Sequence, residues 1–172
     1  MTTISLSNTC DENNFSVFFK QHIKPLRNFL LYKFGNIDQA EDMTQEAFIK
    51  LWQNCINVPL EKAKSYLYTI ANNSSLNQIA HQKVVLEYEK SFDGLDKNNQ
   101  NPEFLLEEKE FKTKLLTAIQ DLNETQRVTF LMNRIDGKKY KEIAEELNIS
   151  VKAVEKRIHL ALVELRKKID NI

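Results

Sequence analysis

The sequence of 172 residues contains few of the residues that end helices and build turns. Glycine and proline occur three times each. This scarcity argues against a β-sandwich, a β-barrel or a collagen-like chain, because those folds use both residues at their many turns. Hydrophobic residues make up 42% of the chain and charged residues 28%, enough for a packed core under a solvated surface. The composition therefore favours an all-α protein of one medium or two small domains.

Cysteines and long apolar runs are equally scarce. Cys10 and Cys55 are the two cysteines. Their spacing matches no pair of metal ligands, and two cysteines make no disulfide framework, so a reducing compartment is the default expectation. No stretch reaches the ~18 apolar residues of a membrane span, and the polar start of the chain is unlike a signal peptide. We expect a soluble, cytoplasmic protein that does not insert into a membrane by itself.

Net charge is zero overall, but charge is segregated along the chain. The 24 basic residues balance the 24 acidic ones. Residues 85–111 carry 8 acidic and 3 basic residues, whereas residues 112–172 carry 9 acidic and 13 basic residues. The stretch 91–104 is polar and without period, which is typical of a linker. The sequence thus predicts two small helical domains, 12–90 and 105–170, joined by a flexible acidic linker.

Helical periodicity predicts three helices in the N-terminal half. The first spans about 15–34. The second opens at Asp38, which with Glu41 has the spacing of a capping box. Its buried face is expected to include Trp52, and its opposite face is acidic and rich in amides. The third helix spans about 63–81 and carries Asn and Ser at its polar positions.

The C-terminal half is predicted to hold four helices, at about 103–122, 123–136, 138–147 and 151–169. The last two are joined by a tight turn that contains Asn148, which tolerates positive φ, and Ser150, a good N-cap. A short helix, a tight turn and a long basic helix form the helix-turn-helix arrangement, whose second helix enters the DNA major groove. Its basic side chains could bond phosphates or guanine edges. An ordinary helical hairpin with a solvated basic face is the plainer alternative.

Two sets of motifs carry a resemblance to a known family. Residues 140–161, YKEIAEELNISVKAVEKRIHLA, together with LNETQR at 122–127, resemble region four of bacterial sigma factors. Helix-turn-helix domains of response regulators look similar. Residues 38–52, DQAEDMTQEAFIKLW, look like the region-two signature of extracytoplasmic-function sigma factors, and SYLYTIANN at 65–73 resembles the helix that follows it. In this order the motifs identify the chain as resembling that family, within the sigma-70 superfamily, over nearly its whole length.

The resemblance implies an alternative sigma factor that binds core RNA polymerase and directs promoter-specific transcription initiation. It implies no enzyme activity, no cofactor and no metal. The face that would dock the clamp helices of the largest polymerase subunit consists of Glu41, Asp42, Gln45 and Glu46. The residues that would read the minus-ten element of promoter DNA are Tyr66, Asn72, Asn73, Asn77, His81 and Lys83. Those that would read the minus-35 element are Ser150, Lys152, Ala153, Lys156, Arg157 and Leu160. An anti-sigma factor clamped between the two domains is implied by the same analogy.

Plainer interpretations accompany these assignments. An acidic helix face is usually just solvated, and Tyr66 and Tyr68 are more often core residues than stacking platforms for bases. Asn72 and His81 stand where family members usually carry Arg or Lys, so we expect the free chain to bind promoter DNA weakly. Two other functions stay open: a transcriptional regulator of the response-regulator type that acts without polymerase, and a helical protein-binding module such as a polymerase inhibitor.

Overall fold

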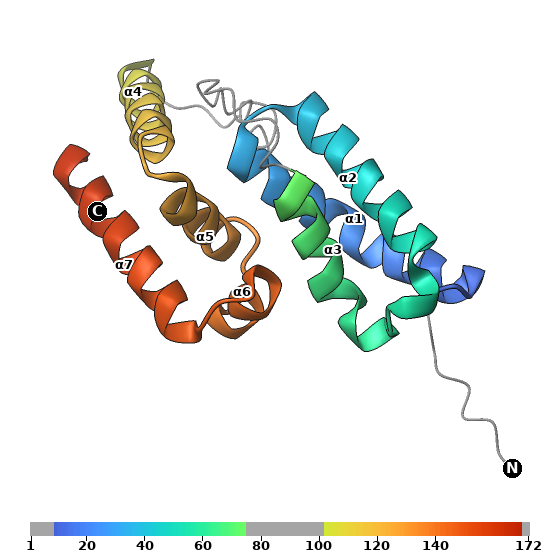
Figure 1. The fold of residues 1–172 in the computed structure, drawn as a ribbon. Coiled ribbons are helices and arrows are strands. Elements are labelled where there is room, and N and C mark those ends of the chain that lie inside the picture. The colour runs from blue at the N-terminus through green and yellow to red at the C-terminus, as the bar shows by residue number, and fades with distance from the viewer. Residues whose placement is uncertain (1–8, 75–101, 170–172) are drawn as a thin grey trace, which may run out of the picture.

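The structure is a computed structural model that describes residues 9–74 and 102–169. These residues form α-helices and one short 3-10 helix, with no strand among them, so the predicted all-α fold of two helical domains is confirmed (Figure 1). The N-terminal half contains α1 (Glu12–Phe34), α2 (Ile37–Gln53), η1 (Cys55–Asn57) and α3 (Leu60–Ser74). The C-terminal half contains α4 (Pro102–Gln120), α5 (Glu124–Arg134), α6 (Tyr140–Leu147) and α7 (Val151–Lys168). Most of the predicted linker, 91–101, lies outside the described residues, and its last three positions belong to α4.

Helix α1 is defined by a cap at each end. The Asp11 side chain accepts a hydrogen bond from the backbone N–H of Asn14 at 2.9 Å, which satisfies one of the free donors of the first turn. The helix continues through Pro25 and ends at Gly35, whose φ of 69° is a left-handed conformation that glycine adopts at little cost. The sequence therefore places a sharp stop between α1 and α2.

The start of α2 differs from the prediction. The helix begins at Ile37, and its cap is Asn36, whose side chain accepts from the backbone N–H of Gln39 at 2.8 Å. The predicted capping box of Asp38 and Glu41 was wrong, because Asn36 already occupies the capping position. The Glu41 carboxylate instead pairs with Arg27 of α1 at 3.3 Å.

The three N-terminal helices enclose an apolar core. α1 packs along α2, and α2 packs against α3. The largest side chains with almost no exposure in this half are Leu26, Leu30, Tyr32, Leu51, Leu67 and Tyr68. α3 starts directly after Pro59, and residues 75–81 of the predicted third helix lie outside the described residues.

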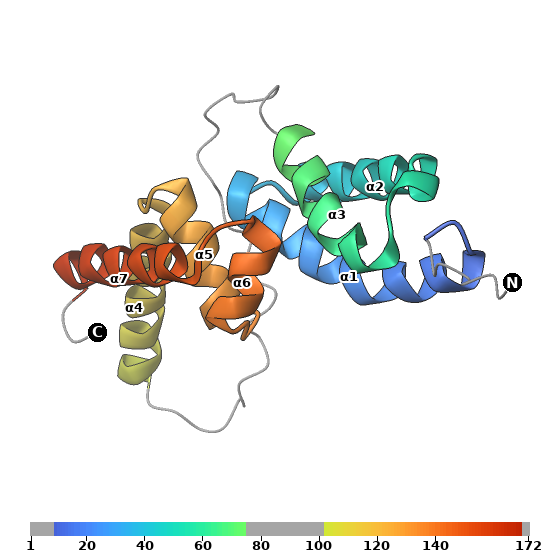
Figure 2. The same ribbon diagram turned by 60° about the horizontal axis from the view of Figure 1, so that its bottom comes forward.

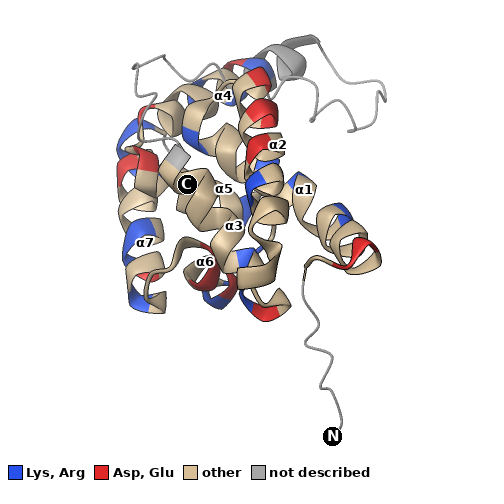
Figure 3. Ribbon diagram, turned by 45° about the vertical axis from the view of Figure 1, so that its right-hand side comes forward, with Lys and Arg blue, Asp and Glu red and all other residues tan. Residues whose placement is uncertain are grey.

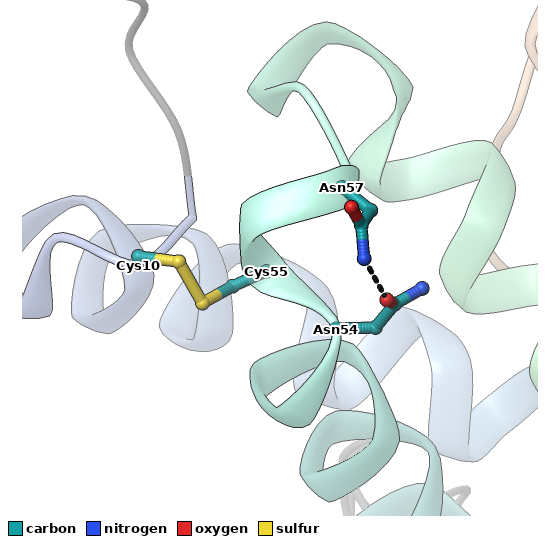
Figure 4. The surroundings of a disulfide bond; sticks show 4 residues. All are labelled: Cys10, Asn54, Cys55 and Asn57. Atoms are coloured by element: carbon teal, nitrogen blue, oxygen red, sulfur yellow. Dashed lines mark hydrogen bonds between the residues drawn. A yellow bond between two sulfur atoms is a disulfide. The ribbon is translucent and has the colours of Figure 1, made fainter.

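The two cysteines are bonded to each other. Cys10 precedes α1 and Cys55 lies in η1, with Cα atoms 5.1 Å apart and a sequence separation of 45 (Figure 4). The expectation of reduced cysteines was wrong, because the start of α1 packs beside the end of α2. In the same region the rings of Phe15 and Trp52 meet edge to face, 4.7 Å between centroids. Sequence spacing alone gives no sign of this proximity.

The C-terminal half contains the predicted helix-turn-helix. Asn148 ends α6 in the left-handed conformation, with φ 52° and ψ 49°, and the Ser150 hydroxyl accepts from the N–H of Ala153 to start α7. At the start of α5, Asn123 caps the helix by accepting from the N–H of Gln126 at 2.9 Å. α7 packs on α5, α6 and α4 through a narrow stripe of fully buried residues: Val154, Ile158, Ala161 and Leu165.

The two halves contact each other directly. α5 packs against α1, and α6 packs against α3, so the first helix of the helix-turn-helix lies beside the N-terminal helices while α7 extends away from them (Figure 2). Buried apolar residues of both halves form one continuous cluster. None of the described helices is long and apolar enough to cross a membrane.

Candidate functional site

The acidic face of α2 is open to solvent. All four side chains predicted to bind polymerase are exposed: Glu41, Asp42, Gln45 and Glu46. Glu46 pairs with Lys50 one turn later at 2.6 Å, and Glu41 pairs with Arg27. In the described part of the chain, Asp42 has no ion pair. Figure 3 shows acidic positions along α2. The helix thus presents a partly neutralised negative surface, suited to a basic partner.

An apolar groove that the sequence did not predict borders this acidic face. It lies between α1 and α2 and has a volume of about 680 Å³. Trp52 was predicted to be buried, but 38% of it is exposed, and Ile49 is 56% exposed. Trp52 and Ile49 are exposed because the apolar positions of α2 span a wider arc of the helix surface than α1 and α3 can cover. The groove is lined by Phe15, Phe19, Gln45, Phe48, Ile49 and Trp52, among others.

The predicted minus-ten residues are only partly described. Asn72 and Asn73 are exposed near the end of α3. Tyr66 is half-buried, and its hydroxyl accepts from the Asn54 amide at 2.8 Å, which ties the ring to the end of α2. The other three predicted residues, Asn77, His81 and Lys83, lie outside the described residues.

One cation beside these amides was not predicted. The ammonium of Lys33, at the end of α1, donates to the side-chain oxygen of Asn72. Burial lowers the pKa of Lys33, and the carboxylate of Glu124 works against that shift. Little in the sequence indicates this contact, since a lysine near the C-terminal end of a helix usually interacts with the helix dipole.

Tyr68 is a core residue, as the plainer interpretation held. Its ring lies 5.2 Å from that of Phe29, and its hydroxyl accepts from the ammonium of Lys138 at 3.3 Å. Burial raises the pKa of Tyr68 far above its usual range, and the carboxylate of Glu146 adds to the shift. Because only 2% of Tyr68 is exposed, its ring is unavailable for stacking on a base.

The predicted minus-35 residues share the outward face of α7. Lys152 and Lys156 are exposed, Ala153 and Arg157 are half-buried, and Leu160 is 38% exposed. Basic positions run along this helix in Figure 3. Ser150 lies at the entry to the helix, and its side chain is engaged as the cap. Since the opposite face of α7 is buried, this is the face of α7 that solvent reaches.

A cavity of about 540 Å³ lies between the two halves. Its walls carry residues predicted to bind two different DNA elements, since Asn72 and Asn73 lie on one side and Arg157 lies on the other. Asn148 of the tight turn also lines it. Within the described ranges, no group of three or more His, Cys, Asp or Glu side chains could hold a metal ion.

The chain combines a three-helix body that has an acidic helix with a helix-turn-helix whose second helix is basic. This combination is typical of two-domain transcription factors. The family model for Sigma-70 region 2 matches residues 18–84, and that for Sigma-70, region 4 matches residues 112–165. The ECF RNA polymerase sigma factor SigW of Bacillus subtilis is 31% identical over 148 residues, which cover 80% of this chain and 79% of that protein. The chain therefore belongs to the extracytoplasmic-function sigma factors, which direct transcription initiation by RNA polymerase.

Two further comparisons agree with this assignment. The ECF RNA polymerase sigma factor SigE of Mycolicibacterium smegmatis is 26% identical over 149 residues, which cover 86% of this chain and 58% of the length of SigE. Among solved structures, the sigma factor RpoE of Bartonella quintana, crystallised with the anti-sigma factor NepR, has a TM-score of 0.59. That alignment covers 92% of this chain and 99% of RpoE at 20% identity, so it shows the shared fold.

Proposed function

We propose that the two halves divide the work of an alternative sigma factor. Residues 12–90 would bind core RNA polymerase and the minus-ten element, and residues 105–170 would bind the minus-35 element. The observation that carries this proposal is the pairing of an exposed acidic α2 with an outward basic face on α7 in one chain. A DNA-binding protein that acts alone needs the second feature and not the first.

The polymerase contact is assigned to α2 and the groove beside it. Asp42 and Glu46 would face a basic surface of the clamp helices of the largest subunit, and electrostatic complementarity of this kind speeds encounter and sets register. Trp52 and Ile49 would add apolar contact area next to the charges. Buried aromatic side chains surrounded by a polar rim are the usual source of binding energy at such interfaces.

The promoter contacts are assigned to α3 and α7. Asn73 would bond a base edge of the single strand, because an amide can both donate and accept, and the contacts must offset an unstacking cost of a few kcal/mol. Lys156 and Arg157 would bind phosphates or guanine edges in the major groove. Lys33 adds positive charge beside Asn72, where the described end of α3 has no Lys or Arg of its own.

The rival function is a regulator of the response-regulator type that binds DNA without polymerase. The match to region 2 over residues 18–84 favours the sigma factor, because that region lies outside the helix-turn-helix. The deciding experiment adds the purified chain to core RNA polymerase and sequences the transcripts. New start sites that require the chain are expected. If the chain binds DNA but neither co-elutes with core polymerase nor creates new starts, the regulator is the better description.

Two further expectations follow from the proposed function. The chain would act in the cytoplasm, because bacterial RNA polymerase and the chromosome are there. An anti-sigma factor that contacts both domains stays a prediction by analogy with the family. Co-purification with a candidate inhibitor, followed by loss of transcription in the reconstituted system, would test it.

A further inference from the structure

The disulfide between Cys10 and Cys55 lies at one end of the apolar groove between α1 and α2. Glu12, two residues after Cys10, lines the groove, and so does Gln53, two residues before Cys55. Figure 4 shows the bond between the segment before α1 and η1. The disulfide is therefore next to the surface that we assign to core RNA polymerase.

Each cysteine leads through a short helical segment to an aromatic ring of the groove. The backbone N–H of Phe15 donates to the carbonyl oxygen of Asp11, the residue after Cys10, at 2.8 Å. On the other side, Trp52 lies in the last turn of α2, three residues before Cys55. The rings of Phe15 and Trp52 meet edge to face, and both line the groove. A change at the disulfide therefore affects this pair of rings.

The segment before α1 is held in place at a cost. Thr9 is fully buried, and its hydroxyl oxygen finds no hydrogen-bond partner among the described residues. A buried hydroxyl without a partner loses the hydrogen bonds that water would give it, which opposes packing. The covalent bond from Cys10 to Cys55 offsets this cost. Breaking the bond therefore favours release of the segment from η1.

The two cysteines differ in how far solvent reaches them, since Cys10 is half-buried and Cys55 is 8% exposed. One thiolate of a protein dithiol can therefore attack Sγ of Cys10, which breaks the sulfur–sulfur bond and releases Cys55 as a thiolate that takes up a proton. The second thiol of the reductant then displaces Cys10 as a thiol and leaves the reductant as a disulfide. Exchange with glutathione disulfide restores the bond and yields two molecules of reduced glutathione.

We propose that Cys10 and Cys55 form a reversible thiol–disulfide switch that sets the affinity of this chain for core RNA polymerase, with the oxidised form binding more tightly. The inference rests on the proposed function, which assigns the groove to polymerase and the chain to the cytoplasm. Disulfides in cytosolic proteins are usually transient and serve catalysis or redox sensing. In the oxidised form the groove is ordered before polymerase arrives, so less conformational entropy is lost on binding.

The first measurement tests whether the bond is reversible. The full chain is equilibrated with mixtures of reduced and oxidised glutathione, and its free thiols are counted by mass after labelling with N-ethylmaleimide. Both cysteines should become labelled as the fraction of reduced glutathione rises, and both should be protected again when oxidised glutathione is restored. A bond that persists in reduced glutathione alone is structural, and this result overturns the switch. A chain that keeps both thiols in oxidised glutathione alone also overturns it.

The second measurement follows the groove itself, because Trp52 is the only tryptophan of the chain. Its emission should move to longer wavelength and its quenching by acrylamide should increase on reduction, since the ring loses its contact with Phe15. The doubly substituted Cys10→Ser, Cys55→Ser chain should match the reduced wild type with or without reductant. Far-ultraviolet circular dichroism confirms that each form keeps its helices. Identical emission from the oxidised and reduced wild type contradicts any coupling between the bond and the groove.

The deciding measurement compares the affinities of the two redox forms for core polymerase. Each form is freed of small thiols and titrated without oxygen in an isothermal calorimeter, so that polymerase meets the same buffer. The reduced chain and the double serine variant should both bind about fivefold or more weakly than the oxidised chain, because binding must then order the groove. Equal affinities, or tighter binding by the reduced form, refute the switch. If neither form binds core polymerase, the proposed function fails instead.

A matched control alters η1 without touching the disulfide. Asn57→Ala removes the 2.7 Å hydrogen bond from the Asn57 amide to the side-chain oxygen of Asn54. This variant should keep the affinity difference between its oxidised and reduced forms. Loss of that difference would mean that the local structure of η1, and not the bond between the cysteines, sets the affinity.

Discussion

The guanidinium of Arg127 in α5 donates through Nε to the backbone carbonyl oxygen of Tyr32 in α1, at 3.0 Å, although 95 residues separate the two. Its Nη2 donates to the carbonyl of Lys33. The carbonyls in the last turn of a helix have no partner within it, and a buried cation at that end also compensates the helix dipole. Arg127 belongs to the motif that resembles region four, yet here it completes a helix of the other half.

Charge reversal on α2 should impair polymerase binding alone. We expect Asp42→Lys and Glu46→Lys each to weaken binding to core polymerase tenfold or more, about 1.4 kcal/mol, because like charges then face each other. Fluorescence anisotropy of the labelled chain measures the affinity. Glu110→Lys on exposed α4 is the control and should change nothing. Unchanged affinity in both α2 variants would remove this helix from the interface.

Replacing basic side chains on the outward face of α7 with alanine should weaken promoter binding and leave polymerase binding unchanged. Lys156→Ala and Arg157→Ala should each weaken promoter binding of the holoenzyme by about 1–3 kcal/mol, because each loses a phosphate or base contact. Affinity measured over a range of salt concentrations separates the two kinds of contact, since loss of a phosphate contact lowers the salt slope by about one. Lys167→Ala is the control, as that ammonium pairs with Glu164 at 2.8 Å. A control as impaired as the variants would indicate nonspecific attraction only.

The turn of the helix-turn-helix depends on the backbone of Asn148. Its φ of 52° is left-handed, so Asn148→Val should lower the free energy of unfolding by about 1–2 kcal/mol. Asn148→Gly should leave it nearly unchanged, because glycine adopts this conformation freely. Urea denaturation of both variants measures the difference. Equal stability of the two variants would mean that the turn relaxes to another conformation.

The disulfide between Cys10 and Cys55 should stabilise the N-terminal half. A bond that closes a loop over a separation of 45 residues reduces the entropy of the unfolded chain, worth up to about 4 kcal/mol in the loop-closure estimate. Adding reductant should therefore lower the melting temperature of the wild type. The doubly substituted Cys10→Ser, Cys55→Ser chain should melt at the lower temperature and not respond to reductant. A wild type that is insensitive to reductant would contradict the bond.

His22 should make stability dependent on pH. Burial lowers the pKa of His22 below its ordinary value of 6.5, and the ammonium of Lys64 adds to the shift. Below pH 6.5 the unfolded chain therefore binds a proton that the folded chain does not, and the free energy of unfolding falls as the pH drops toward the folded pKa. Above pH 6.5 this contribution is complete. Denaturation at pH 7.5 and 5.5 should show a smaller difference for His22→Gln than for the wild type.

Whether a prediction was correct depended largely on how far apart in the sequence the interacting residues lie. Asn123, Asn148 and Ser150 could be assigned from the sequence because each bonds backbone within a few residues. The cap of α2 was misplaced at Asp38, because Asn36, two residues earlier, offers a side-chain acceptor that the prediction did not consider. The exposure of Trp52 depends on how much of α2 its neighbours cover, which local periodicity does not specify.

The sequence by itself determined the helices, the helix-turn-helix and the order of the two sigma-factor motifs, because periodicity, caps and motif spacing are local properties of the chain. Only the tertiary structure decided that Cys10 meets Cys55, that an apolar groove borders the acidic helix, and that Asp136 bonds α1 across the boundary between the halves. These contacts join residues that are distant in the chain. Their formation depends on how whole helices pack, since packing is set by the summed shape and burial of many side chains rather than by any single segment.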